Sequence, residues 1–141
     1  MTTVVISDRP AGKALPAALW VVQLLLAVLF GGAGYAKVAT SLPELAVGLP
    51  YTADLPGALV RFIGVSELAG AIGLVLPSLL RIVPILTPAA AIGLNVVMWL
   101  ATLFHLFRGE WRDMLMTFVI GNLAAFVAWG RLKKAPIRPR A

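Results

Sequence analysis

The chain has 141 residues, of which 60% are hydrophobic and only 13% are charged, and its mean hydropathy is +0.94. A soluble domain carries about 25% charged residues, so 12 Lys and Arg with 6 Asp and Glu are too few to cover a water-exposed surface. We therefore expect an integral membrane protein, and the length allows one domain of roughly four transmembrane helices at about 20 residues per crossing. A large catalytic domain outside the membrane is excluded.

Four apolar runs reach the length of a membrane-spanning helix, and they cover residues 17–38, 57–76, 83–107 and 113–130. None of them alternates at period two, which argues against a β-barrel. The sequence therefore predicts a single all-α domain over residues 1–141, a bundle of four transmembrane helices that ends in a basic tail at 131–141. A basic flank precedes the first run, as in a cleaved signal peptide. The run is longer than the usual 7 to 15 apolar residues, so we expect it to remain as a transmembrane helix.

Proline and tryptophan mark the ends of these runs. Pro56 and Pro77 bound the second run, and Trp111 and Trp129 flank the fourth as interfacial anchors. The connection between the first two runs, residues 40–56, is too apolar for a flexible linker, and residues 43–48 could form one or two helical turns.

Basic residues are distributed unequally between the two sides. Five of the 12 Lys and Arg residues lie in the last eleven positions, and Arg9, Lys13 and Arg81 fall on the same side of a four-helix topology. The opposite side carries Arg108 and Arg112. The positive-inside rule predicts that both termini lie on the cytoplasmic side of a bacterial-type inner membrane. A basic tail beside a membrane helix indicates orientation or anionic lipid, so we expect no nucleic-acid partner.

The residues that could bind metals or cofactors are scarce. The chain has no cysteine and one histidine, so thiolate, iron–sulfur, Cys-type zinc and bis-His haem sites cannot be built from it. We expect no haem, iron–sulfur cluster or metal, and an electron-transfer role would need a bound cofactor, such as a quinone, or a partner protein.

Polar side chains inside the apolar runs are costly in lipid and need a reason. Glu67 lies roughly 15 Å below Gly57, near mid-membrane, and shares a helix face with small residues, so it should point into the bundle. Lys37 shares a stripe at heptad spacing with Phe30 and Gln23. A pocket between the helices is expected from these positions, lined by the candidate ligand-binding residues Lys37, Arg61, Glu67, Asn95, Trp99, His105 and Asn122.

Each candidate also has a purely structural explanation. Lys37 and Arg61 could extend to lipid headgroups, and His105 could be an ordinary interfacial contact. Asn95 and Asn122 could hydrogen-bond across helices as packing contacts. Glu67 is either a functional group or one half of a structural ion pair with Lys37 or Arg61.

The sequence also resembles a known family. The segments RFIGVSELAGAIGLVLP and PILTPAAAIGLNVVMWLATLFH, after a Lys at the end of the first run and a GLP before the second, are similar to the DoxX-like family of small four-helix membrane proteins. The resemblance spans residues 30–129 and rests on the order and spacing of Lys37, Gly48, Pro50, Arg61, Gly64, Glu67, Gly70, Pro77, Pro88, Ala89, Ala101 and His105. It implies a membrane-embedded ligand-binding or accessory role, since relatives have been linked to quinone-reactive oxidoreductases and redox-stress complexes.

Three functions stay open. The bundle could bind a lipophilic small molecule, such as a quinone, in the polar-lined pocket. It could instead be an accessory subunit or assembly factor whose polar groups contact a membrane or redox protein. The chain could also form a homo-oligomer. It could also be an enzyme in which Glu67 is the catalytic acid–base on a lipophilic substrate.

Overall fold

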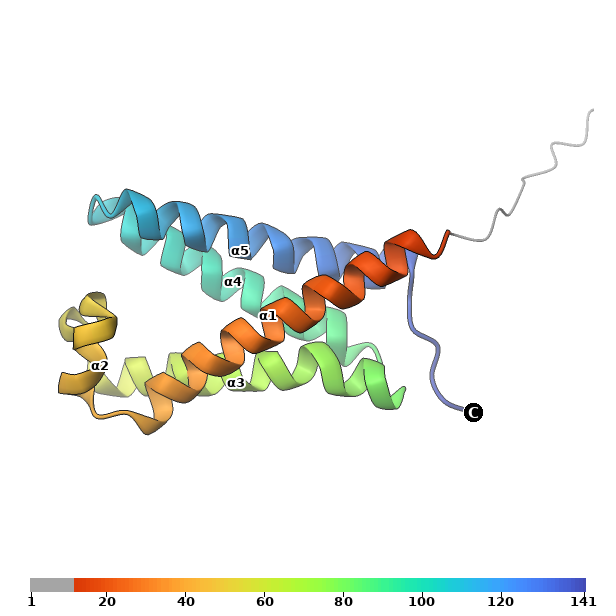
Figure 1. Cartoon of the computed structure of the whole chain (residues 1–141), viewed down its shortest axis with the longest axis horizontal. Helices are drawn as coiled ribbons and strands as arrows, with labels where there is room; N and C mark the ends of the chain where they lie inside the picture. The colour runs from red at the N-terminus through yellow and green to blue at the C-terminus, as the bar shows by residue number, and fades with distance from the viewer. Residues whose placement is uncertain (1–11) are drawn as a thin grey trace, which may run out of the picture.

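The computed structural model describes residues 12–141, and every regular element within them is helical (Figure 1). Four of the helices are long and apolar enough to cross a membrane. The predicted four-helix membrane bundle is thereby confirmed. In chain order the elements are α1 (Ala14–Ala39), α2 (Leu42–Gly48), the 3-10 helix η1 (Pro50–Asp54), α3 (Gly57–Leu80), α4 (Leu86–Phe107), α5 (Trp111–Trp129) and the π-helical turn η2 (Gly130–Lys134). Arg9, counted above as a topology signal, lies outside the described residues.

The boundary between the second and third helices differs from the prediction. Helix α3 continues through Pro77 to Leu80 instead of ending at residue 76. A proline removes one backbone donor, which a helix packed inside a membrane bundle tolerates. The turn that follows holds Arg81 and Val83 at φ of 58° and 45°. Two left-handed residues in this turn delay the start of α4 to Leu86, three residues later than the apolar run suggested.

The connection after α1 is helical, as predicted. Helix α2 covers the expected segment and buries Leu45, and η1 follows it directly. We call the end of the bundle that carries α2, η1 and the α4–α5 turn the connection end. The opposite end, with the start of α1, the α3–α4 turn and residues 131–141, is the tail end. Figure 1 shows the connection end on the left and the tail end on the right.

The long helices pack as two close pairs, α1 with α3 and α4 with α5. A Cβ atom on Gly34 would lie 2.7 Å from the carbonyl oxygen of Gly64, so the backbones of α1 and α3 touch where these two glycines cross. Such close approach is how helices gain packing energy in lipid. Helices α4 and α5 form a hairpin through Gly109, whose φ of +71° favours glycine.

Helix α1 runs diagonally across the bundle and connects the two pairs (Figure 1). It lies near α5 at the tail end and on α3 at the connection end. Helix α1 therefore lies away from α5 at the connection end. The apolar core fills the middle and contains Leu26, Phe30, Ala71, Leu74, Ala91, Leu94, Met98, Ile120, Ala124, Val127 and Ala128.

Polar side chains tie the tail end together. The buried side chain of Gln23 donates to the carbonyl of Leu74 at 2.6 Å and accepts from Nε of Arg131 at 2.6 Å. The chain after η2 then folds back onto the α3–α4 turn, where Nε of Arg81 donates to the carbonyl of Arg138 and the backbone N–H of Arg140 donates to the carbonyl of Arg81.

Candidate functional site

The centre of the site is a buried ion pair between α1 and α3. The Nζ of Lys37 lies 2.8 Å from Oε2 of Glu67, and the two side chains are only 5% and 4% exposed. Each residue stands three positions after the glycine of its helix in the Gly34–Gly64 crossing, which brings their side chains within reach. The expectation that Glu67 faces the bundle interior is confirmed.

Arg61 has a different role from those weighed in the sequence. Its Nη1 donates to the backbone carbonyl of Lys37 and, at 2.7 Å, to that of Thr40. These carbonyls belong to the last turn of α1, which has no further helical N–H to satisfy them. A guanidinium at this helix end also interacts favourably with the helix dipole. Arg61 therefore fixes the end of α1 and positions Lys37 through its backbone, and it does not pair with Glu67.

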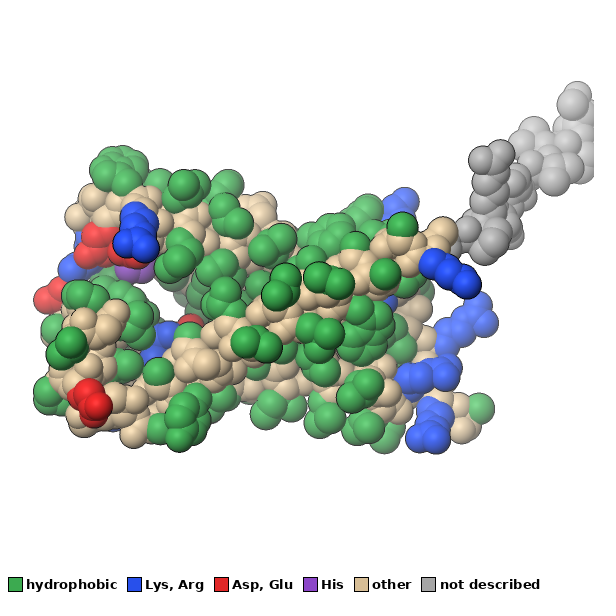
Figure 2. Space-filling view, viewed as in Figure 1, with side chains coloured by type: hydrophobic (Ala, Val, Ile, Leu, Met, Phe, Trp, Pro, Cys, Tyr) green, Lys and Arg blue, Asp and Glu red, His purple; other side chains and the backbone are tan. Residues whose placement is uncertain are grey.

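A cavity of about 500 Å³ opens beside the ion pair, between the splayed helices. Most of its wall is apolar and comes from α1, η1, α3, α4 and α5, while its polar lining residues are Lys37, Tyr51, Ser66, Glu67, His105, Asp113 and Thr117. Several apolar wall residues, such as Leu29, Phe62 and Leu100, are also exposed on the lipid-facing surface. Figure 2 shows the hollow toward the connection end, with basic and acidic side chains visible at its depth. The wall of the cavity thus continues into the apolar outer surface of the bundle.

His105 lies at the connection-end rim of the cavity, held by neighbours. Its Nδ1 lies 2.6 Å from Oε2 of Glu110, and its ring packs edge-on against Tyr51 with the ring centroids 5.2 Å apart. Arg108 donates to Glu110 at 2.8 Å and to Asp54 of η1 at 2.7 Å. These contacts fasten η1 to the α4–α5 turn beside the rim of the cavity.

Hydrogen bonding and burial at this end shift two pKa values. Hydrogen bonds from His105 and then from Arg108 hold the pKa of Glu110 below its ordinary value. Burial raises the pKa of Tyr51 above 10.0, and the positive charge of Lys37 opposes this rise. Tyr51 therefore remains a phenol at neutral pH and can donate a hydrogen bond into the cavity.

Four of the predicted pocket residues do not line the cavity: Arg61, described above, and the three that follow. Asn95 donates to the carbonyl of Gly121 at 2.7 Å and joins α4 to α5. Trp99 is 44% exposed and packs edge-on against the exposed Phe118. Asn122 is exposed and donates to the carbonyl of Phe118 in its own helix at 2.8 Å. The prediction that Asn122 lies beside Glu67 was wrong, because an amide that bonds its own helix backbone can face lipid.

Of the seven predicted residues, the structure brings Lys37, Glu67 and His105 together at one cavity. Tyr51 and Asp113 join them there and were not predicted. Tyr51 follows the GLP segment in a connection that the sequence marks as structured, and that segment was the available signal. Asp113 is the first residue of the fourth apolar run, and no pattern in the sequence places it at a pocket.

His105, Glu110 and Asp113 place one ligand-type atom each within 4.8 Å of one another. The Nδ1 of His105 is already hydrogen-bonded to Glu110, and the other oxygen of Glu110 accepts from Arg108. Two of the three side chains, His105 and Glu110, therefore already have hydrogen-bond partners, and we assign no metal to this cluster.

Comparison with known proteins identifies one family. The model of the DoxX-like family matches residues 21–127, which is most of the chain. No curated protein and no solved structure matches the sequence.

Proposed function

Because the chain belongs to the DoxX-like family of membrane proteins, we propose that it binds a lipophilic small molecule with a polar head, of the quinone type, in the cavity beside the Lys37–Glu67 ion pair. The observation that supports this most directly is the cavity itself, about 500 Å³ of mainly apolar wall with an ion pair at its side. Ligand sites have this composition, with few polar groups in a largely apolar cavity of roughly 300 to 1,000 Å³.

The ion pair can recognise a polar head without being broken. An ammonium group has three N–H donors and a carboxylate has two oxygens, whereas the salt bridge joins only Nζ of Lys37 to Oε2 of Glu67. Lys37 therefore has donors left for a carbonyl oxygen, and Glu67 has an acceptor left for a hydroxyl. Tyr51 and His105 add polar groups at the rim. Catalysis by Glu67 would require separating it from Lys37, so the geometry favours binding over acid–base chemistry.

A short-chain benzoquinone is a direct probe of this site. Quenching of tryptophan fluorescence on titration of the purified protein in detergent should give a saturable Kd for wild type. Ala101→Phe places a ring in the cavity wall and should weaken binding at least about 10-fold. Ala125→Phe is the matched control, because Ala125 is exposed and does not line the cavity. Equal affinity in wild type and both variants would refute this function, as would no binding by wild type together with no lipophilic molecule in organic extracts of the native protein.

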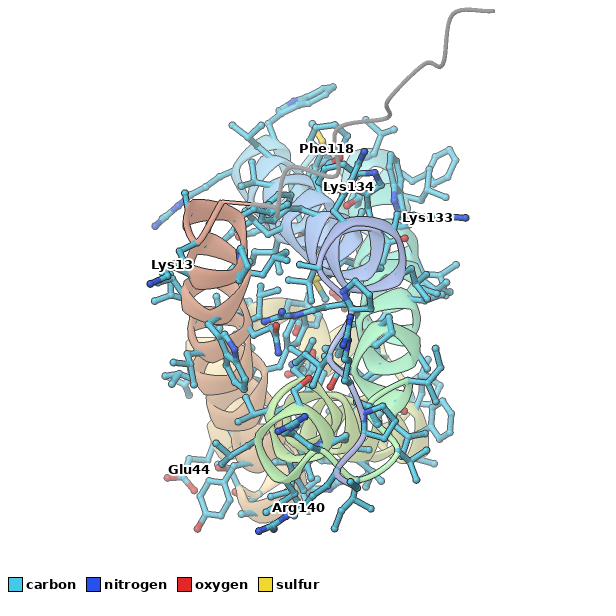
Figure 3. All side chains as sticks on the ribbon, turned by 90° about the vertical axis from the view of Figure 1, so that its right-hand side faces the viewer. Lys13, Glu44, Phe118, Lys133, Lys134 and Arg140 are labelled. Atoms are coloured by element: carbon cyan, nitrogen blue, oxygen red, sulfur yellow. The ribbon has the colours of Figure 1, made fainter. Side chains whose placement is uncertain are left out.

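We also propose that the tail end faces the cytoplasm of a bacterial-type inner membrane. Lys13, Arg81, Lys133, Lys134, Arg138 and Arg140 all lie at that end (Figures 2 and 3). Cytoplasmic loops carry this excess of Lys and Arg. In intact cells, an impermeant thiol reagent should label a cysteine at Ala53, which is exposed at the connection end, and spare one at Arg138. The reverse labelling pattern would show that the tail end faces the outside, which contradicts the proposed topology.

A further inference from the structure

A second pocket lies at the tail end, far from the cavity described above. It has a volume of about 380 Å³ and is formed by the start of α4 and the returning tail. Its lining residues are Val83, Pro84, Ile85, Pro88, Arg131, Pro136, Ile137 and Pro139. Arg131 is the single charged residue among them. A pocket with apolar walls and one guanidinium is suited to an anionic head attached to an apolar body.

Arg131 is buried without an anionic partner. Its residue exposure is 5%, and its Nε and Nη1 donate to Gln23 and to the carbonyl of Ala135. Its Nη2 is buried and has no hydrogen-bond partner among residues 12–141. No salt bridge of the described chain includes this guanidinium. A buried cation in this state is costly unless an acceptor completes its hydrogen bonds. The guanidinium lies over the Trp20 ring, with its carbon 5.4 Å from the ring centroid, and its Nη2 still has no hydrogen-bond acceptor.

The surroundings of the pocket select for negative charge. Figure 3 looks onto the tail end and shows Lys13, Lys134 and Arg140 spread around the rim of that end of the bundle. The acidic residues of the described chain lie elsewhere, in α2, η1, the middle of α3 and the α4–α5 turn and start of α5. A cluster of cations next to membrane helices attracts the anionic headgroups of the adjacent leaflet.

From the unpartnered guanidinium, the apolar pocket and the basic rim, we propose that the tail end binds one anionic phospholipid, with Arg131 donating to its phosphate. The side chains of Val83 and Ile85, which line the pocket, are 53% and 58% exposed. These residues offer the apolar contact that acyl chains require and a free phosphate ion does not use. This inference is independent of the ligand proposed for the larger cavity.

Native mass spectrometry of the full chain can test the proposal with phosphatidylglycerol and phosphatidylcholine as probes. Wild type should retain one phosphatidylglycerol at activation energies that strip phosphatidylcholine. Arg131→Gln should reduce the phosphatidylglycerol-bound fraction at least about 10-fold, and Ile137→Trp, which fills the pocket and leaves the arginine in place, should do the same. Lys133→Gln is the matched control at the same end, because Lys133 is exposed and does not line the pocket. It should change the bound fraction less than 2-fold.

The outcomes separate the sources of the anion. An equal loss of bound phosphatidylglycerol in Lys133→Gln and Arg131→Gln would show that diffuse electrostatic attraction, and not a defined site, retains the lipid, and it would overturn the proposal. Retention of phosphatidylglycerol by both pocket variants would also overturn it. Thermal stabilisation of wild type by inorganic phosphate equal to that by phosphatidylglycerol would assign the site to a free ion, against the proposal. Because Arg131 also bonds Gln23, the Ile137→Trp result keeps the test decisive even where Arg131→Gln unfolds.

Discussion

Separating the structural and ligand-binding roles of the Lys37–Glu67 pair is the most informative perturbation of this protein. Both side chains are almost fully buried, at 5% and 4% exposure. Removing one partner of a buried pair typically costs about 3 to 5 kcal/mol, because the other charge is left uncompensated. Glu67→Gln keeps an acceptor oxygen for Lys37, so we expect a loss of about 3 kcal/mol in the free energy of unfolding. Lys37→Met leaves an unpaired carboxylate and should cost at least as much.

The double variant removes both charges, and replacing a whole buried pair is often close to neutral. We therefore expect it to be more stable than either single variant, with a coupling energy of at least about 2 kcal/mol. Unfolding by SDS in mixed micelles, followed by tryptophan fluorescence, gives the four free energies under one condition. A second cycle with Arg61→Gln and Glu67→Gln should couple by less than about 0.5 kcal/mol, because Arg61 contacts backbone carbonyls and not the carboxylate.

A coupling below about 0.5 kcal/mol for Lys37 and Glu67 would refute the structural ion pair. A strong coupling combined with loss of benzoquinone binding in the stable double variant would show that the pair serves both the fold and the ligand. Full binding by the double variant would confine the pair to a structural role.

Two further predictions follow from packing and from charge. Gly34→Ala places a methyl group 2.7 Å from the backbone of Gly64 and should lower the free energy of unfolding by about 1 to 3 kcal/mol. Gly32→Ala in the same helix is the control, because its methyl group would have no neighbour within 4 Å, and it should be neutral or stabilising. SDS unfolding measures both variants, and equal effects would contradict the close crossing of α1 and α3. The pKa of Glu110 is lowered in the folded state, so its stabilising contribution is complete above its unfolded pKa of about 4.3 and disappears as pH falls through the lower folded value. As the pH is lowered through this range, the melting temperature of wild type should fall more steeply than that of Glu110→Gln. Parallel curves would contradict the stabilising role of the Glu110 carboxylate.

The four long helices could be predicted because each needs only an apolar run of sufficient length, and length is local information. The interior position of Glu67 could also be predicted, since small residues share its helix face and lipid exposure of a carboxylate is costly. The buried stripe of Gln23, Phe30 and Lys37 follows the same logic and is confirmed by burial of all three.

The partners of the polar groups could not be predicted, because they depend on how the helices are rotated and tilted against each other. Trp99 and Met98 are neighbours in the sequence, but Met98 is buried and Trp99 faces outward. The role of Arg61 depends on backbone carbonyls, which no side-chain pattern reveals. Arg131 was expected to be one more cation of a basic tail, and only the π-helical turn that continues α5 brings it inside the bundle.

The bond between Gln23 and Arg131 also bears on how the protein is made. These residues are separated by 108 positions, so α1 enters the membrane long before its partner at the other end of the chain has been synthesised. The crossing of α1 with α3 requires only the first 80 residues and can form while synthesis continues. The tail end can close only after Arg131 has left the ribosome, and until then the backbone carbonyl of Leu74 is the one described hydrogen-bond partner that the Gln23 side chain can have. The order of synthesis thus leaves the tail end as the final part of the bundle to assemble.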